Sequence, residues 1–211
     1  MNQLRRCLDA MPLVAILRGM DPEEAPAAFD ALTGAGIRII EVPLNRPGAF
    51  ESLRILVRCA GDDILIGAGT VLSAEEAEAV ADAGARLMVA PNCDPAVIET
   101  ARALGLQTMP GVATPSEALA ALKAGADALK LFPAEMLPPK ILTAWRAVLS
   151  PECLLVPVGG IRPESIADYA RAGASGFGIG SALFQPKIAP AELAGRAESF
   201  VRCCRGHFNI R

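Results

Sequence analysis

Short apolar runs alternate with amphipathic, alanine- and glutamate-rich stretches along this chain. The runs are continuous rather than interleaved with polar residues, which is typical of parallel strands covered on both faces. The amphipathic stretches between them have the character of helices. The strand candidates are residues 13–17, 37–44, 64–70, 86–91, 107–112, 127–132, 154–159 and 176–180. The pattern therefore predicts an α/β protein built from eight βα units.

Capping residues and glycines mark the helix boundaries at regular places. Helices begin at a capping residue before a proline, as in Asp21-Pro22, or at a serine or threonine followed by glutamate three residues later, as in Ser73 and Glu76. Glycines typical of left-handed C-caps close five helical stretches just before a strand: Gly36, Gly84, Gly105, Gly125 and Gly173.

Eight such units indicate a TIM (β/α)8 barrel, with residues 1–211 forming one domain. A doubly wound sheet is the alternative, but the glycine-rich segments 67–70 and 176–180 do not complete a G-x-G-x-x-G fingerprint. Prolines follow several strand candidates, where pairing stops. Pro157 lies nearer the middle of its run, and the sequence offers only a local bend or bulge to explain it.

Composition narrows the function. With 211 residues, 52% of them hydrophobic, the chain can bury a large core. The net charge is −3 and the basic residues are scattered, so we expect neither a nucleic-acid partner nor a membrane surface, while small anions remain possible partners. No apolar run approaches the ~18 residues of a membrane span. Six cysteines without a CxxC pair favour reduced thiols and a cytoplasmic location.

Lys130 is the most informative residue, because it is an amine within an otherwise apolar strand candidate. Burial penalises the charged form of a lysine and can lower its pKa from ~10.4 by several units. A neutral amine can attack a carbonyl and form an iminium. The alternative is a lysine that snorkels to solvent or pairs with a carboxylate.

Glu41 lies in the other strand candidate that embeds an ionisable residue among branched apolar neighbours. Working residues of such barrels lie at the carboxyl ends of strands, so Glu41 and Lys130 could converge there, although alternation alone does not show that both point inward. A structural ion pair with an arginine is the alternative for Glu41. Polar residues at other strand ends are Arg18, Asn45, Thr70, Asn92 and Ser181.

Acid-base chemistry needs a side chain that carries protons. The single histidine, His207, lies in the polar C-terminal tail and is not expected to be catalytic. A glutamate beside a lysine amine can do this work instead. No cluster of Asp, Glu and His is visible at the strand ends, so we do not expect metal catalysis.

Glycines after the last two strand candidates suggest an anion site. Val158-Gly159-Gly160 and the segment Gly178 to Ser181, which includes Gly180, offer backbone N–H groups in the loops where barrels often bind phosphate. Tight turn geometry is the alternative explanation.

Several segments together resemble the 2-keto-3-deoxy-6-phosphogluconate and phosphogalactonate aldolases. The similarity runs nearly end to end and in chain order. The segments are Ala15-Ile16-Leu17-Arg18-Gly19, Ile40-Glu41-Val42-Pro43-Leu44-Asn45, Gly67-Ala68-Gly69-Thr70-Val71, Pro91-Asn92, Pro110-Gly111, Leu129-Lys130-Leu131-Phe132-Pro133-Ala134-Glu135 and Val158-Gly159-Gly160.

The resemblance implies a homotrimeric class I aldolase on a TIM barrel, acting on a phosphorylated keto-sugar acid without a cofactor. Lys130 would form the Schiff base and Glu41 would be the general acid/base. Thr70 and the Pro91 segment would hold the pyruvate-like carboxylate, and Arg18 would contact the substrate. The residues expected around the phosphate are Gly159, Gly160, Gly178, Gly180 and Ser181.

Two positions favour the galactonate branch of this resemblance. Gluconate-type members carry a threonine before the Gly-Gly pair and an arginine four residues after the catalytic glutamate, whereas this chain has Val158 and Asn45. The two substrates differ in configuration at C4, so exchanging a hydroxyl for an isopropyl group changes which C4-OH orientation is satisfied. The resemblance therefore implies cleavage of 2-dehydro-3-deoxy-6-phosphogalactonate to pyruvate and D-glyceraldehyde 3-phosphate, with the gluconate epimer as the alternative.

Two other readings use the same residues. A sugar-phosphate epimerase would employ Lys130 and Glu41 as acid and base and preserve the carbon skeleton. A phosphate-binding barrel without activity would have no use for a desolvated amine.

Overall fold

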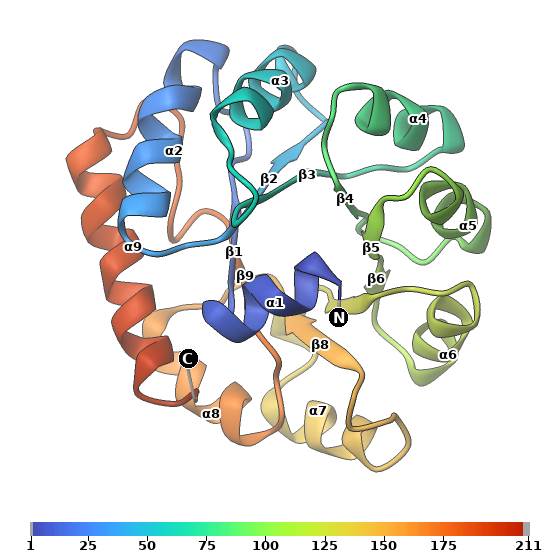
Figure 1. Cartoon of the computed structure of the whole chain (residues 1–211). Coiled ribbons are helices and arrows are strands. Elements are labelled where there is room, and N and C mark those ends of the chain that lie inside the picture. The colour runs from blue at the N-terminus through green and yellow to red at the C-terminus, as the bar shows by residue number, and fades with distance from the viewer. Residues whose placement is uncertain (1, 209–211) are drawn as a thin grey trace.

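The computed structural model describes residues 2–208, whose strands form two parallel sheets surrounded by helices (Figure 1). One sheet has six strands in the order β5-β4-β3-β2-β1-β9, and the other has three in the order β6-β7-β8. The strands are Leu13–Ile16 (β1), Ile39–Pro43 (β2), Leu65–Gly69 (β3), Leu87–Val89 (β4), Gln107–Met109 (β5), Gly111–Val112 (β6), Ala128–Leu131 (β7), Leu154–Pro157 (β8) and Phe177–Ile179 (β9).

The predicted closed, eight-stranded TIM barrel is wrong, although the α/β class and the strand positions are confirmed. The candidate at 107–112 is two strands, β5 and β6, separated at Pro110. Proline has no N–H for a ladder, so the first sheet ends there. Between the last strands a single bridge joins Val158 to Gly178. The result is an open, curled six-stranded sheet with a small second sheet, rather than one closed ladder.

The helix boundaries follow the local sequence signals. Ser73 accepts a hydrogen bond from the Glu76 N–H at 3.2 Å, and Thr114 and Glu117 form a reciprocal capping box. All five predicted C-cap glycines have positive φ. The helices are Gln3–Ala10 (α1), Ala25–Gly34 (α2), Ala49–Cys59 (α3), Ala74–Asp82 (α4), Pro95–Ala103 (α5), Pro115–Lys123 (α6), Pro139–Arg146 (α7), Pro163–Arg171 (α8) and Pro190–Arg205 (α9), with short 3-10 turns η1 (Pro22–Glu24) and η2 (Ala134–Met136).

Two apolar clusters occupy the two faces of the strands. Ile40 and Leu129 belong to the outer cluster, between the strands and the ring of helices. Ile39 and Ala128, their neighbours in sequence, belong to the inner cluster, which also contains Leu4 of α1. Figure 1 shows α1 lying across one end of the strands, where Gln3 donates to the backbone carbonyl of Ile64 just before β3. Helix α1 therefore closes the amino end and leaves the carboxyl end for a site.

Pro157 is the last residue of β8 and is paired in register with Leu131. It therefore lies where the ladder ends, and no central bulge is needed to accommodate it. Among residues 2–208, no helix combines the length and apolar character needed to cross a bilayer.

Candidate active site

Glu41 and Lys130 both point into the interior of the curled sheets. Glu41 lies two residues after Ile39 on β2, and Lys130 lies two residues after Ala128 on β7. Side chains two apart share a face of a strand, and both Ile39 and Ala128 belong to the inner cluster. Glu41 is 1% and Lys130 5% exposed. The structure thus supplies the inward direction that the sequence pattern left open.

Burial shifts the pKa values of these two groups toward their neutral forms. Burial raises the pKa of Glu41 from 4.5 to about 7, against the opposing effect of the positive charges on Lys130 and Arg18. Burial also lowers the pKa of Lys130, while the Glu41 charge opposes this shift and Arg18 adds to it. Burial thus favours the uncharged amine of Lys130 over its ammonium form, and the carboxyl group of Glu41 can take up and release a proton near neutral pH.

The Glu41 carboxylate packs directly on the backbone of Gly69. A Cβ at Gly69 would overlap the Glu41 carboxylate, so the position requires a residue without a side chain. Glu41 Oε2 is buried and has no hydrogen-bond partner within residues 2–208. A buried carboxylate oxygen without a partner is costly, and such strain is typical of functional groups that wait for a ligand.

Thr70, directly after Gly69, has a positive φ of 59°. This conformation is unfavourable for a β-branched residue, and outliers of this kind cluster at functional sites. Pro91 approaches the same region from the end of β4. Its carbonyl packs against Gly111, which is paired in register with Lys130. Thr70 and Pro91 thus lie on strand ends that neighbour Glu41 and Lys130.

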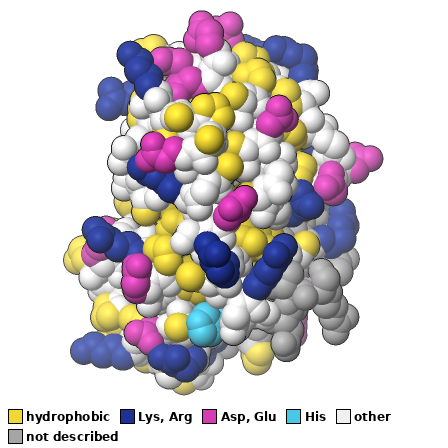
Figure 2. All heavy atoms as spheres, turned by 90° about the vertical axis from the view of Figure 1, so that its left-hand side faces the viewer, with side chains coloured by type: hydrophobic (Ala, Val, Ile, Leu, Met, Phe, Trp, Pro, Cys, Tyr) yellow, Lys and Arg dark blue, Asp and Glu magenta, His cyan; other side chains and the backbone are white. Residues whose placement is uncertain are grey.

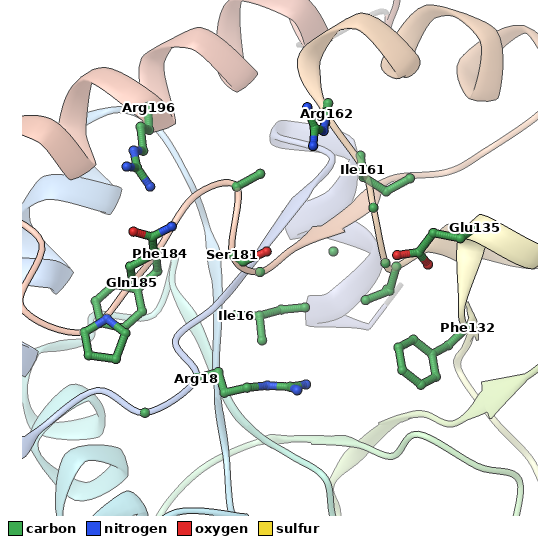
Figure 3. A pocket seen from close by; sticks show the side chains of 18 of the residues that line it. Ile16, Arg18, Phe132, Glu135, Ile161, Arg162, Ser181, Phe184, Gln185 and Arg196 are labelled. Carbon is green, nitrogen blue, oxygen red and sulfur yellow. The ribbon is translucent and has the colours of Figure 1, made fainter.

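A pocket of about 1300 Å³ opens at the carboxyl ends of the strands (Figure 3). Polar and apolar side chains line it together, which is typical of small-molecule sites. Seven of the eleven predicted site residues lie on its wall. They are Arg18, Val158, Gly159, Gly160, Gly178, Gly180 and Ser181.

The other predicted residues, Glu41, Lys130, Thr70 and Pro91, are not part of that wall. Two residues that line the pocket, Phe132 and Arg18, lie near the buried side chains of Glu41 and Lys130. The Lys130 Nζ lies 4.7 Å from the centroid of the Phe132 ring, and Phe132 lines the pocket. Arg18 also lines the pocket and interacts electrostatically with both Glu41 and Lys130.

The loop after β8 is shaped by its two glycines. Gly159 and Gly160 have φ values of 109° and 63°, in the left-handed region that glycine adopts without strain. Glu135 packs against this loop, and a Cβ at Gly160 would lie 2.9 Å from its Oε1. A Cβ at Gly178 would lie 2.6 Å from Val158 Cγ2, so this position also has no room for a side chain.

Six further charged residues line the pocket that sequence reasoning did not select as site residues: Asp21, Arg46, Glu135, Arg162, Glu164 and Arg196. Three of them had a local signal, because they stand beside selected segments: Arg46 after Asn45, Glu135 after the Lys130 strand and Arg162 after the Gly-Gly pair. Arg196 had none. It comes from α9, and only the packing of that helix brings it to the pocket.

The family of KDPG and KHG aldolases matches residues 4–195 of the sequence. The chain belongs to this aldolase family. The match spans β1 to β9, so it includes both the buried pair and the pocket wall.

Individual relatives agree with this family assignment. The chain is 50% identical to a probable 2-dehydro-3-deoxy-6-phosphogalactonate aldolase of Rhizobium meliloti (strain 1021), covering 88% of each chain. It is 42% identical to the 2-dehydro-3-deoxy-6-phosphogalactonate aldolase of Escherichia coli (strain K12), covering 92% of this chain and 95% of that one. A solved structure described as native KDPGal superimposes with a TM-score of 0.91 at 42% identity, over 93% of this chain and 96% of that chain.

Proposed function

We propose that this protein is a class I aldolase that cleaves 2-dehydro-3-deoxy-6-phosphogalactonate to pyruvate and D-glyceraldehyde 3-phosphate. Two relatives with 50% and 42% identity carry the name of this activity. The observation on which the proposal rests is the buried pair of Lys130, with a lowered pKa, and Glu41, with a pKa raised to about 7. A neutral amine and a proton-transferring carboxyl group are the two groups that Schiff-base cleavage needs.

The reaction begins when the neutral Nζ of Lys130 attacks the C2 ketone of the substrate. Loss of water gives an iminium at C2, which can accept the electron pair of the C3–C4 bond. Glu41 removes the proton of the C4 hydroxyl, either directly or through water. The C3–C4 bond then breaks, the C4 oxygen becomes the aldehyde of glyceraldehyde 3-phosphate, and the electron pair forms an enamine on Lys130.

The second half of the reaction releases pyruvate. The enamine is protonated at C3 by the carboxyl group of Glu41, which holds the proton taken from C4. Water then hydrolyses the iminium, returning a free amine and pyruvate. With a pKa of about 7, Glu41 is suited to both directions of this transfer, and the steps need no metal or organic cofactor.

The substrate would lie with its ketoacid end inward and its phosphate outward. Thr70, with the Pro91 segment, would hold the carboxylate near Lys130, and Arg18 would contact the substrate. The phosphate would lie at the glycine loops, among Gly159, Gly160, Gly178, Gly180 and Ser181. This orientation is supported by the arrangement of a buried inner group below an open pocket with positive charges on its wall.

Val158 supports the galactonate rather than the gluconate epimer. Its isopropyl group lines the pocket and offers no hydroxyl to a C4-OH. A hydroxyl left without a partner in a partly closed site loses binding energy, so the side chain here affects discrimination between C4 epimers. The gluconate epimer remains the alternative substrate, and a direct comparison of the two separates them.

The experiment has two parts. Incubation with pyruvate and borohydride should add one reduced pyruvate to Lys130, which peptide mass spectrometry detects. Pyruvate release is then measured with both C4 epimers. An unmodified Lys130 contradicts the Schiff base, and turnover that preserves the six-carbon skeleton would indicate an epimerase instead.

We propose further that the protein is a cytoplasmic homotrimer. The trimer is supported by the family resemblance, and the location by six cysteines that are all free in the structure. Size-exclusion chromatography with light scattering measures the mass, and a value of one or two chains would contradict the trimer.

A further inference from the structure

The pocket wall carries positive side chains in addition to the backbone N–H groups of the glycine loops. Four arginines line it: Arg18, Arg46, Arg162 and Arg196. Arg18 lies toward the buried pair, with which it interacts. Arg162 and Arg196 come from other elements, and Figure 3 shows both guanidinium groups directed into the cavity that Ser181 also lines.

We propose that Arg162 and Arg196 clamp the phosphate of the substrate over the glycine loops and thereby make the phosphate a requirement for efficient turnover. This inference rests on the proposed function, because it assigns the charge recognition at the phosphate end of the same substrate. The two residues are binding residues and take no part in the transfer of protons or electrons.

Arg162 presents an unpaired cation from a fixed backbone. It is the N-cap residue of α8, two residues after Gly160. Ser165 Oγ accepts the N–H of Arg162 at 3.1 Å and donates to its carbonyl at 2.8 Å. Within residues 2–208 no carboxylate forms an ion pair with its guanidinium. Its donors are therefore available to an anion that enters the pocket.

Arg196 approaches from α9. Leu193 and Ala197 are buried, which fixes the rotation of the helix and leaves Arg196 half-buried at the pocket edge. Its Nη2 pairs with Glu192 Oε1 at 2.6 Å, one turn earlier. This pair extends the side chain along the helix but uses only part of its five N–H donors. The others are free for a planar, bidentate contact with phosphate oxygens.

The charge balance of the wall makes the two arginines decisive. The lining also contains three carboxylates, on Asp21, Glu135 and Glu164, so the wall has one positive charge in excess. Without Arg162 and Arg196 it would have one negative charge in excess. A phosphate monoester carries roughly −1.5 to −2 at neutral pH, and backbone N–H groups do not cancel a net charge. The glycine loops therefore need these cations to hold a dianion.

The test compares Arg162→Gln, Arg196→Gln and the double variant with the wild type. Arg202→Gln is the matched control, because Arg202 lies on the same helix but lines a different surface groove. We expect kcat/KM for the phosphorylated substrate to fall about 10-fold in each single variant and about 100-fold in the double variant, as for losing hydrogen bonds to a charged group. The rate of borohydride trapping with pyruvate, which has no phosphate, should stay within about twofold.

Binding of glycerol 3-phosphate, measured by calorimetry, tests the clamp independently of turnover. Its Kd should rise about 10-fold in each of the two single variants and remain unchanged in Arg202→Gln. Wild-type kcat/KM and Kd in the double variant would overturn the clamp, as would an equal loss of pyruvate trapping. If the wild type formed no pyruvate adduct, the proposed function would fail, while glycerol 3-phosphate binding would still decide the clamp.

Discussion

The inward-facing side chains are buried at both ends of the strands, but they are apolar at the amino end and ionisable at the carboxyl end. At the amino end α1 inserts Leu4 and Leu8 into the inner cluster, and the polar groups that it brings are bonded. The backbone N–H of Leu4 donates to Gln107 Oε1, and Gln3 donates to the carbonyls of Asp62 and Ile64, just before β3. At the carboxyl end the same strands carry Glu41 and Lys130, and Glu41 Oε2 has no partner in the described structure.

Within a single strand, one end therefore contributes to stability and the other end to the candidate site. Ile39 and Glu41 share one face of β2, as Ala128 and Lys130 share one face of β7, so each strand contributes an apolar side chain to the closed end and an ionisable one to the site. Burying ionisable groups costs folding free energy, which the apolar end offsets. We therefore expect substitutions at the amino end to change stability, and substitutions at the carboxyl end to change activity.

Lys130→Met, at the carboxyl end, should have the largest effect on activity. Without the amine no iminium forms, and kcat should fall by on the order of 10⁴-fold or more, as for other covalent nucleophiles. Stability should rise by about 1 kcal/mol at pH 6, because an apolar side chain of similar length replaces a buried amine while Glu41 is mostly protonated. Steady-state pyruvate release and denaturant unfolding measure the two effects. Lost stability with retained turnover would reverse the assignment of this end.

Glu41→Gln should have the second largest effect. The amide keeps the volume but carries no proton, so kcat should fall by about 10² to 10⁴-fold, the range of general acid/base catalysis. The pyruvate adduct on Lys130 should still accumulate in long borohydride incubations, because the amine remains. An adduct that never forms would show that Glu41 is needed to build the site rather than to move a proton.

Leu8→Ala tests the amino end. Leu8 is 2% exposed within the inner cluster, so the truncation should lower the free energy of unfolding by about 2 to 5 kcal/mol. At a temperature where the variant is folded, kcat/KM should stay within about twofold. A large loss of turnover in the fully folded variant would show that the two ends are coupled, contrary to the comparison.

The pH dependence of the free energy of unfolding should show what it costs to bury the Glu41 carboxylate at the carboxyl end. The pKa of Glu41 is raised from 4.5 to about 7 by folding, so the folded state binds the proton more tightly than the unfolded state. Stability from this group is fully present below pH 4.5 and is lost as pH rises toward 7. Relative to Glu41→Gln, the wild type should lose up to about 3 kcal/mol across this window. Denaturant unfolding of both proteins measures the difference, and a constant difference contradicts a raised pKa.

Candidate site residues could be selected from the sequence where an unusual residue type stands in a short segment. Lys130 and Glu41 stand out because an ionisable group inside an apolar run is visible in the sequence. The residues of the Gly-Gly and Gly178 to Ser181 segments were selected by their place after strands, and the structure puts them on one pocket wall. Arg196 was missed because it lies within helix α9 rather than in a segment that follows a strand.

The sequence alone indicated the order of the helices and strands, except that it merged β5 and β6, since capping, proline and apolar periodicity act over a few residues. It also marked Glu41 and Lys130 as ionisable residues within apolar strands, and the structure showed that both are buried. The tertiary structure decided that Pro110 divides the sheet, and that Gly69 leaves room for the Glu41 carboxylate. It also decided that α9 brings Arg196 to the pocket. These outcomes depend on packing between segments distant in the chain, which no local pattern encodes.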